Sequence, residues 1–218
     1  MFAYLSESYQ MPLENLHRGE DYAWALWRLA EEEAHLRKLV PGIEPIPNHI
    51  TNAQKRLEFI GARVLVAELL KQWGHDFHGL IKDEFGKPYP KGYPYQISLS
   101  HSYPYVAAIL QKDRPAGIDL EQPKPKLLRV APRVLHAEEL KDAGDDVIKH
   151  CIYWSAKESL VKIHGKKDLV FAENIRISPF SREKHGFLIG RLIVDTQETA
   201  IPLQYFVEAN FVVVLNRN

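Results

Sequence analysis

The sequence is poor in cysteine, carries no excess of charge of either sign and contains no long apolar run. A single cysteine among 218 residues, Cys151, excludes an internal disulfide, and no Cys/His pair has the spacing of a zinc site. The 28 Lys and Arg residues balance the 28 Asp and Glu residues, so no overall field favours nucleic acid or a membrane surface. Any site for an anion must therefore be local.

Targeting and membrane-spanning patterns are missing as well. No apolar stretch approaches the ~20 residues that cross a bilayer. The N-terminal residues contain Glu7 and Glu14 and no long apolar run, so we expect no signal peptide. With 45% hydrophobic and 26% charged residues, the composition is typical of a soluble globular protein with one domain or two small ones. These observations favour a cytoplasmic protein.

A first long helix is predicted in the N-terminal half. Thr51 or Asn52 is a suitable N-cap for a helix that extends to about Trp73 and buries a leucine-rich stripe. Arg56 and Arg63 are seven residues apart and share a face of this helix. They are either two solvated arginines or part of a site for an anion.

A second long helix is predicted from Val147 to His164, because no Gly or Pro interrupts this stretch. Asp145 or Asp146 is its expected N-cap, and the run from Gly165 to Lys167 is expected to end it.

One face of this second helix carries polar groups at a spacing of four residues. Trp154, Glu158 and Lys162 stack on that face. Glu158 and Lys162 therefore present opposite charges side by side, which is either an ordinary surface ion pair or part of a site.

Between the two helices the pattern changes to that of strands. Gln96 to His101 alternates, with Ser98 and Ser100 on one side and apolar residues on the other. Val106 to Leu110 is strongly apolar and follows a turn, so a hairpin is predicted. Ala116 to Glu121 follows as a third strand.

This third strand carries an acidic pair. Asp119 and Glu121 point to one side, while Ile118 and Leu120 face the core. Two carboxylates on one side of a strand can hold one hard divalent cation, because Mg²⁺ takes oxygen ligands and keeps waters or phosphates in its shell. The D-x-E pattern is weak evidence by itself, and Glu158 is available as a third acidic group.

Groups that can donate to phosphate oxygens occur before this strand. Lys87 follows Gly86 in a turn where glycine relaxes the backbone. Ser100 and His101 lie at the end of a strand, and such donors suit a phosphate. Because a lone histidine is more often structural, the prediction depends on the order of the motifs along the chain, which is G-K-P, S-x-S-H-S, G-I-D-L-E and W-S-A-K-E-S-x-x-K.

The remainder of the chain has weaker signals. Prolines at positions 123, 125 and 132 interrupt the segment after the acidic strand, and a short helix is predicted at His136 to Leu140. The later strands are predicted at Asn174–Ile177, Phe187–Val194, Leu203–Glu208 and Val212–Leu215.

The four motifs in this order resemble those of the 4′-phosphopantetheinyl transferases, of the larger monomeric type that activates surfactin synthetase and serves peptide and polyketide synthases. The last two motifs, correctly ordered and spaced, are quite specific together. The matching residues are Gly86, Lys87, Pro88, Ser100, His101, Ser102, Gly117, Ile118, Asp119, Leu120, Glu121, Trp154, Lys157, Glu158 and Lys162.

The resemblance implies an α+β fold of two similar halves related by an approximate two-fold axis. Each half is a small antiparallel sheet packed on a long helix, and the active site lies at their interface. We place the N-terminal half at residues 1–115 and the C-terminal half at residues 116–218, within one compact unit.

It also implies the activity and the site. A carrier-protein serine would attack the β-phosphate of coenzyme A, and 3′,5′-ADP would leave, with catalysis by positioning and charge neutralisation. The expected Mg²⁺ ligands are Asp119, Glu121 and Glu158. The expected catalytic residues are Glu158, as general base, with Lys162 and Asp119. The expected coenzyme A ligands are Lys87, Ser100, His101, Arg56, Arg63 and Lys162.

The partners implied are coenzyme A and an acyl, peptidyl or polyketide carrier protein, and the chain is expected to be a monomer. The family's lysine pair for the 3′-phosphate is absent, because residues 40–44 contain no basic residue, and Lys55, Arg56 or Arg63 are the candidates to replace it. An acidic carrier protein would dock on a local basic surface, with Lys124, Lys126 and Arg129 either forming it or lying in a solvated loop.

Two other functions fit the same residues. The first is an Mg²⁺-dependent phosphohydrolase that acts on a nucleotide, with water in place of the serine. The second is a non-catalytic coenzyme A-binding protein in which the acidic residues form a surface patch.

Overall fold

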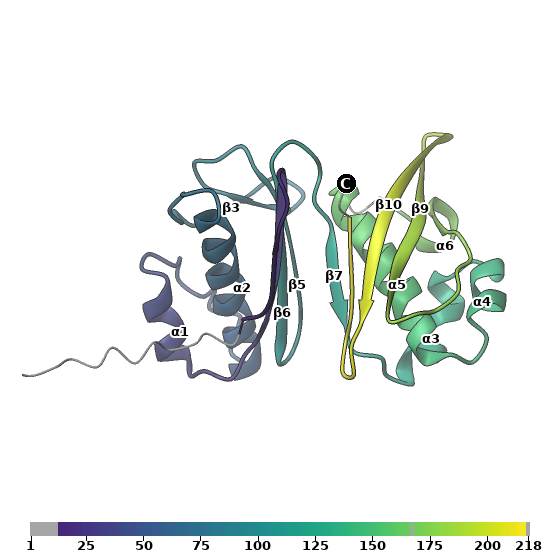
Figure 1. Ribbon diagram of the computed structural model, residues 1–218, viewed down its shortest axis with the longest axis horizontal. Helices are drawn as coiled ribbons and strands as arrows, with labels where there is room; N and C mark the ends of the chain where they lie inside the picture. The colour runs from purple at the N-terminus through teal and green to yellow at the C-terminus, as the bar shows by residue number, and fades with distance from the viewer. Residues whose placement is uncertain (1–12, 167, 217–218) are drawn as a thin grey trace, which may run out of the picture.

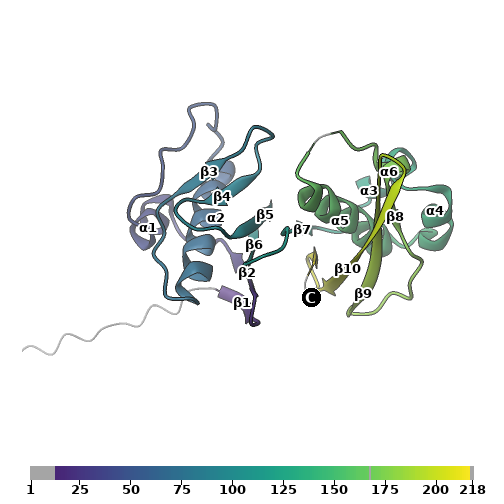
Figure 2. The same ribbon diagram turned by 90° about the horizontal axis from the view of Figure 1, so that it is seen from above.

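The computed structural model describes residues 13–166 and 168–216. The first twelve residues, on which we expect no signal peptide, and Lys167 lie outside the described part of the chain. Two sheets lie face to face at the centre, and each is covered on its outer side by a long helix (Figures 1 and 2). The layers therefore follow the order helix, sheet, sheet, helix.

The first half contains a four-stranded antiparallel sheet with the order β1-β2-β6-β5. Its elements are β1 (Leu13–Arg18), β2 (Tyr22–Arg28), α1 (Glu33–Leu39), α2 (Ala53–Lys71), β3 (Leu80–Lys82), β4 (Pro88–Pro90), β5 (Gln96–Ser102) and β6 (Tyr105–Gln111). The strands β3 and β4 form a separate small hairpin. The hairpin predicted from Gln96 to Leu110 is confirmed as β5 and β6.

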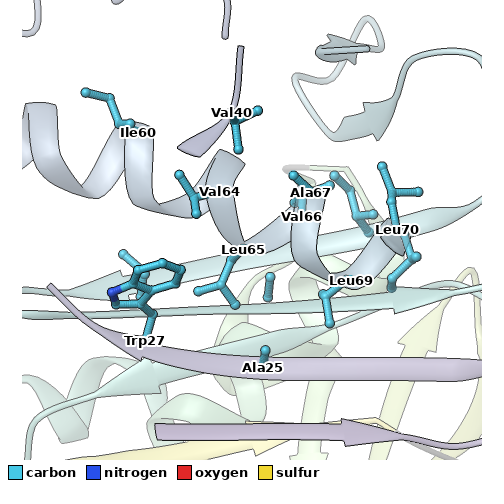
Figure 3. Packing of buried hydrophobic residues seen from close by; sticks show 14 of the residues in the cluster. Ala25, Trp27, Val40, Ile60, Val64, Leu65, Val66, Ala67, Leu69 and Leu70 are labelled. Atoms are coloured by element: carbon cyan, nitrogen blue, oxygen red, sulfur yellow. The ribbon is translucent and has the colours of Figure 1, made fainter. Parts of the chain in front are cut away.

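Helix α2 covers the outer face of this sheet because one side of it is almost entirely apolar. Leu65 and Leu69 are fully buried and point toward Trp27 and Ala25 of β2 (Figure 3). The helix begins where predicted, since the Asn52 side chain accepts a hydrogen bond of 3.1 Å from the Lys55 N–H and so satisfies one free donor of the first turn.

The second half contains a five-stranded antiparallel sheet with the order β7-β11-β10-β9-β8. Its elements are β7 (Ile118–Glu121), α3 (Lys126–Val134), α4 (Ala137–Ala143), α5 (Val147–His164), α6 (Phe171–Asn174), β8 (Ile175–Ile177), β9 (His185–Val194), β10 (Gln197–Val207) and β11 (Val212–Leu215).

Helix α5 has the predicted bounds because both of its ends are chemically specified. The Asp146 side chain accepts hydrogen bonds from the Ile148 and Lys149 N–H groups at 3.0 and 3.1 Å. Gly165 ends the helix in the left-handed conformation with φ of 81°, which a residue without a Cβ atom adopts at little cost.

The two sheets pack on each other through a third apolar core, which includes Trp24, Leu26, Ile118 and Val213. At the edge of this interface, β5 lies beside β7 without a backbone ladder between them. Serine side chains make the link instead, as described below. The third predicted strand therefore belongs to the sheet of the second half.

The segment after β7 differs from the prediction. Lys126–Val134 is a helix despite Pro132, and it buries Leu127 and Ala131 against α5 and its neighbours. The three prolines were interpreted as breakers, but Pro125 stands at the helix start, where a missing N–H costs nothing. Lys126 and Arg129 are thus on a helix and not in a loop.

The α+β class with antiparallel sheets is confirmed. The approximate two-fold relation and the boundary at residue 115 stay predictions. Of the helices formed by residues 13–166 and 168–216, none combines the length and the apolar character of a membrane span.

Candidate active site

A cavity of about 760 Å³ opens between the first half and the end of α5. Apolar side chains such as Phe59, Leu80 and Ile97 form part of its wall. Its charged and titratable residues are Glu44, His49, Lys55, Glu58, Arg63, Lys82, Lys87, His101, Lys162 and Lys166. Six of these are Lys or Arg and two are Glu, so the cavity is positive although the whole chain is neutral.

Lys87 connects the two halves at this cavity. It follows Gly86 in the turn between β3 and β4, and its Nζ atom lies 3.4 Å from the carbonyl oxygen of Ile163 in α5. Burial lowers the pKa of Lys87 because it penalises the charged form. A partly dehydrated cation at the wall of a cavity is suited to bind a phosphate oxygen.

The acidic pair lies beside the cavity, on the face of β7 that is turned toward α5. Asp119 pairs in register with Val214 of β11, and Glu121 pairs with Val212, and both valines pack against α5. Asp119 is only 7% exposed. Both carboxylates lie on the face opposite to Ile118 and Leu120, as predicted, but α5 covers this face, so Asp119 is buried and does not point outward.

Lys162 joins the cavity to the acidic pair. Its Nζ atom donates to Asp119 Oδ1 at 2.8 Å and to the carbonyl oxygen of Ile118 at 2.8 Å. The predicted pairing of Lys162 with Glu158 is thus replaced by a pairing with Asp119 from another element. Helical spacing places Glu158 and Lys162 on one face, but it does not reveal a stronger partner on the adjacent strand.

The surroundings of Glu158 disfavour its negative charge. Its pKa is raised, first because the side chain is half-buried and then because Asp119 and Glu121 add negative charge nearby, while Lys162 opposes both effects. Asp119 and Glu121 therefore lie near enough to Glu158 to disfavour its charged form.

The three carboxylates do not form a closed metal site as they stand. Within the described ranges, no group of three His, Cys, Asp or Glu side chains is arranged to hold an ion. Their chemistry nevertheless fits a hard cation. Asp119 Oδ2 is buried, and no described residue provides it with a hydrogen-bond partner. A buried carboxylate oxygen of this kind is costly unless a positive ligand joins it.

His101 lies at the cavity wall and is held from behind by α2. Its Nδ1 atom is 3.2 Å from Oε2 of Glu58, which also lies 2.7 Å from Lys55 Nζ. Glu58 is 2% exposed and accepts a hydrogen bond from the Tyr103 N–H at 3.0 Å. Burial opposes the ionisation of Glu58, but hydrogen bonds and charge from His101 and Lys55 outweigh it, so the pKa of Glu58 is lowered.

Both arginines of α2 are paired with a glutamate, although the Arg56 side chain is still 36% exposed. Arg56 forms a two-pronged pair with Glu33, at 2.8 and 2.7 Å, and is not part of the cavity wall. Arg63 is 7% exposed, bonds Glu44 at 2.8 Å and stacks 3.3 Å from the centre of the Phe59 ring. Arg63 lines the cavity, so only one of the two is placed to meet a ligand.

Ser100 also lies away from the cavity wall. It is 7% exposed and points across the interface to β7, where its hydroxyl bonds Asp119. Of the predicted coenzyme A ligands, the structure brings Lys87, His101, Arg63 and Lys162 to the cavity, and it places Ser100 and Arg56 elsewhere.

Several residues of the cavity were not predicted from sequence. Lys82, Lys166 and Glu58 line it, yet none belongs to a recognisable motif. Lys82 is in the β3 strand, and Lys166 follows the end of α5. The sequence shows these lysines only as basic residues near the G-K-P turn and after the glycine that ends α5. The fold brings them to one cavity.

The geometry can be compared with known proteins. Residues 115–213 match the model of the 4′-phosphopantetheinyl transferase superfamily. The matched segment is similar to that superfamily and makes up a little less than half of the chain. It contains β7 with Asp119 and Glu121 and helix α5 with Glu158 and Lys162, that is, all three predicted metal ligands.

Three curated relatives carry the name of the same enzyme family. The chain is 28% identical over 152 residues to a 4′-phosphopantetheinyl transferase, psf-1, of Bacillus pumilus, covering 62% of this chain and 65% of the relative. It is 30% identical over 128 residues to a 4′-phosphopantetheinyl transferase of Bacillus subtilis (54% and 55%). It is 35% identical over 127 residues to the transferase ffp of Bacillus subtilis (55% and 52%). The match thus spans less than two thirds of the length of each relative.

Proposed function

We propose that this protein transfers the 4′-phosphopantetheine arm of coenzyme A to a serine of an acyl, peptidyl or polyketide carrier protein and releases 3′,5′-ADP. The observation that carries the proposal is the position of Lys162, which lines the positive cavity and also bonds Asp119 in the acidic group. A pyrophosphate that enters the cavity would therefore meet Lys162 next to the three carboxylates.

The names of the three curated relatives support the same activity. In this reaction the serine Oγ atom forms a bond to the β-phosphorus of coenzyme A, and the bond from that phosphorus to the bridging oxygen of 3′,5′-ADP breaks. The serine proton passes to a base. Glu158 is our candidate, because a carboxylate with a raised pKa is a better proton acceptor than an exposed one.

Asp119, Glu121 and Glu158 would hold Mg²⁺, which supplies charge neutralisation for the pyrophosphate when bound. The partnerless Asp119 Oδ2 and the mutual repulsion of the three carboxylates support this choice. Lys162 would share the developing charge of the leaving group, and Lys87 and His101 would bind phosphates that do not react.

Lys55, Lys82 and Lys166 complete the basic wall, so they are our candidates for the 3′-phosphate in place of the family's lysine pair. Arg56 is excluded from this role in our proposal because Glu33 already occupies both prongs of its guanidinium. The monomeric state and the cytoplasmic location stay predictions from sequence.

The carrier protein would dock on α3. This helix follows β7 directly, contains no acidic residue, and exposes Lys126, Arg129 and Arg133. Positive charges on one helix next to the acidic strand of the site suit an acidic partner that must deliver a serine to that site.

The direct test is a mass spectrum of apo carrier proteins after incubation with this protein, coenzyme A and Mg²⁺. We expect the mass of one phosphopantetheine group to be added, and we expect 3′,5′-ADP in equal amount. Steady release of 3′,5′-ADP without a carrier protein would indicate a phosphohydrolase instead. Binding of coenzyme A without turnover under any of these conditions would indicate a non-catalytic binding protein.

A further inference from the structure

Ser100 of the first half makes an unusual contact with the acidic strand of the second half. Its Oγ atom donates to Asp119 Oδ1 at 2.8 Å and accepts from the Leu120 N–H at 3.1 Å. Both capacities of the hydroxyl are therefore used within the protein, and the side chain is 7% exposed.

The two carboxylate oxygens of Asp119 therefore have different hydrogen-bond surroundings. Oδ1 receives Ser100 from β5 and Lys162 from α5, each at 2.8 Å. Oδ2 is buried, and among residues 13–166 and 168–216 it has no hydrogen-bond partner. Two donors on Oδ1 fix the rotation of the carboxylate, so Oδ2 keeps one direction and remains available.

We propose that Ser100 is a positioning residue for Asp119 and not a ligand of a nucleotide phosphate. By holding Oδ1 across the interface, Ser100 leaves Oδ2 preorganised to take the cation of the site. The inference rests on the proposed function for the identity of the reaction, but it concerns only how the first half orients a carboxylate of the second.

The same strand offers a matched control. Ser98 lies two residues earlier on β5, on the same side of the strand, and is 3% exposed. Its Oγ atom accepts from the Ile118 N–H at 3.1 Å, just as Ser100 accepts from the Leu120 N–H at 3.1 Å. Among the described residues, no hydrogen bond joins Ser98 to a carboxylate. Ser98→Ala therefore removes the interface contact of a serine without touching Asp119.

The test compares Ser100→Ala, Ser98→Ala and the unchanged full-length protein. Mn²⁺ affinity is measured by electron paramagnetic resonance, the binding of 3′,5′-ADP by calorimetry without divalent cations, and kcat and KM with saturating carrier protein. For Ser100→Ala we expect about tenfold weaker Mn²⁺ binding and about tenfold lower kcat, the loss of one hydrogen bond to a charged group. The affinity for 3′,5′-ADP should stay within about twofold.

Ser98→Ala should lower the melting temperature about as much as Ser100→Ala, and it should leave Mn²⁺ binding within about twofold. Ser100→Thr keeps the hydroxyl and should restore most of the Mn²⁺ affinity. This third variant also serves if Ser100→Ala does not fold.

Three outcomes would overturn the proposal. Weaker 3′,5′-ADP binding with unchanged Mn²⁺ binding in Ser100→Ala would make Ser100 a phosphate ligand. Equal loss of Mn²⁺ binding in both alanine variants would make its role merely structural. Absence of Mn²⁺ binding in the unchanged protein would remove the site altogether. Failure of phosphopantetheine transfer with normal Mn²⁺ differences would instead overturn the proposed function alone.

Discussion

At the scale of single residues, the carboxylates of this site differ in the charges that surround them. Glu158 has two carboxylates near it and forms no ion pair within the described part of the chain, whereas Asp119 Oδ1 accepts hydrogen bonds from Lys162 and Ser100. The surroundings of Glu158 therefore disfavour its ionised form. This difference gives a measurable signature in the protein without ligands.

Glu158→Gln should stabilise the protein at neutral pH. The pKa of Glu158 is raised above 4.5 in the folded state, so the contribution of this group to stability is fully present below pH 4.5 and is lost as the pH rises through the folded pKa. The variant lacks this loss. Each unit of pKa difference corresponds to about 1.4 kcal/mol.

Thermal unfolding of both proteins between pH 4 and pH 8, without divalent cations, measures this effect. We expect a higher melting temperature for the variant at pH 7 and convergence near pH 4. Equal melting temperatures of the two proteins at pH 4 and at pH 8 would show that ionisation of Glu158 does not destabilise the folded state.

Lys87 and Lys162 should separate binding from chemistry. Lys87 is assigned to a phosphate that keeps its charge, so Lys87→Ala should raise the KM for coenzyme A by about ten- to a hundredfold with a modest change in kcat. Lys162 contacts Asp119, next to which our proposal puts the reacting phosphate, so Lys162→Ala should lower kcat instead. Steady-state kinetics with saturating carrier protein measure both. A reversed pattern would mean that coenzyme A lies in the opposite direction in the cavity.

At the scale of elements, α5 is fixed in place by a buried ion pair. Lys157 is fully buried, and its Nζ atom lies 2.7 Å from Glu139 Oε2 of α4. The same atom donates to the carbonyl oxygens of Phe171 and Ile175 at 3.1 and 2.9 Å. Glu158 is the next residue on α5. Because the contacts of Lys157 fix the rotation of the helix, they also fix the direction in which Glu158 points.

Lys157→Ala should destabilise the protein by about 3–5 kcal/mol, because it leaves Glu139 buried without its cation. The matched control is Lys71→Ala in α2, whose pair with Glu68 is exposed on the lysine side (56%), and which should cost at most about 0.5 kcal/mol. Urea unfolding measures both. A cost below about 1 kcal/mol for Lys157→Ala would contradict a structural role for the pair.

At the scale of the whole molecule, the net charge is zero, but the basic and the acidic residues gather in different places. The cavity wall and α3 are basic, and the acidic strand β7 directly precedes α3 along the chain. These basic residues would attract an acidic carrier protein, and the attraction would be strongest at low salt, where charges are screened least.

The double variant Lys126→Ala/Arg129→Ala should bind a carrier protein about tenfold more weakly at low salt and lose most of the difference at high salt. The control is Lys38→Ala/Lys71→Ala, which removes the same charge from α1 and the end of α2. Surface plasmon resonance at two ionic strengths measures the association. Equal effects of the two variants would exclude docking on α3.

The sequence by itself determined the local elements that carry the site. Asn52, Asp146 and Gly165 specify helix ends through their own backbone contacts, so the bounds of α5 and the start of α2 were predictable. The acidic pair on a strand and the face with Glu158 were likewise readable from periods of two and 3.6 residues. These signals depend on neighbours within a few positions of the chain.

Only the tertiary structure decided which of these groups meet. Lys162 bonds Asp119 and not Glu158, and Ser100 faces Asp119 and not the cavity, because β7 joins the second sheet and lies between β5 and α5. Arg56 is occupied by Glu33, which is 23 residues away. Contacts between residues distant along the chain leave no periodic signal, so their partners could not be predicted from the pattern that placed each residue on its own element.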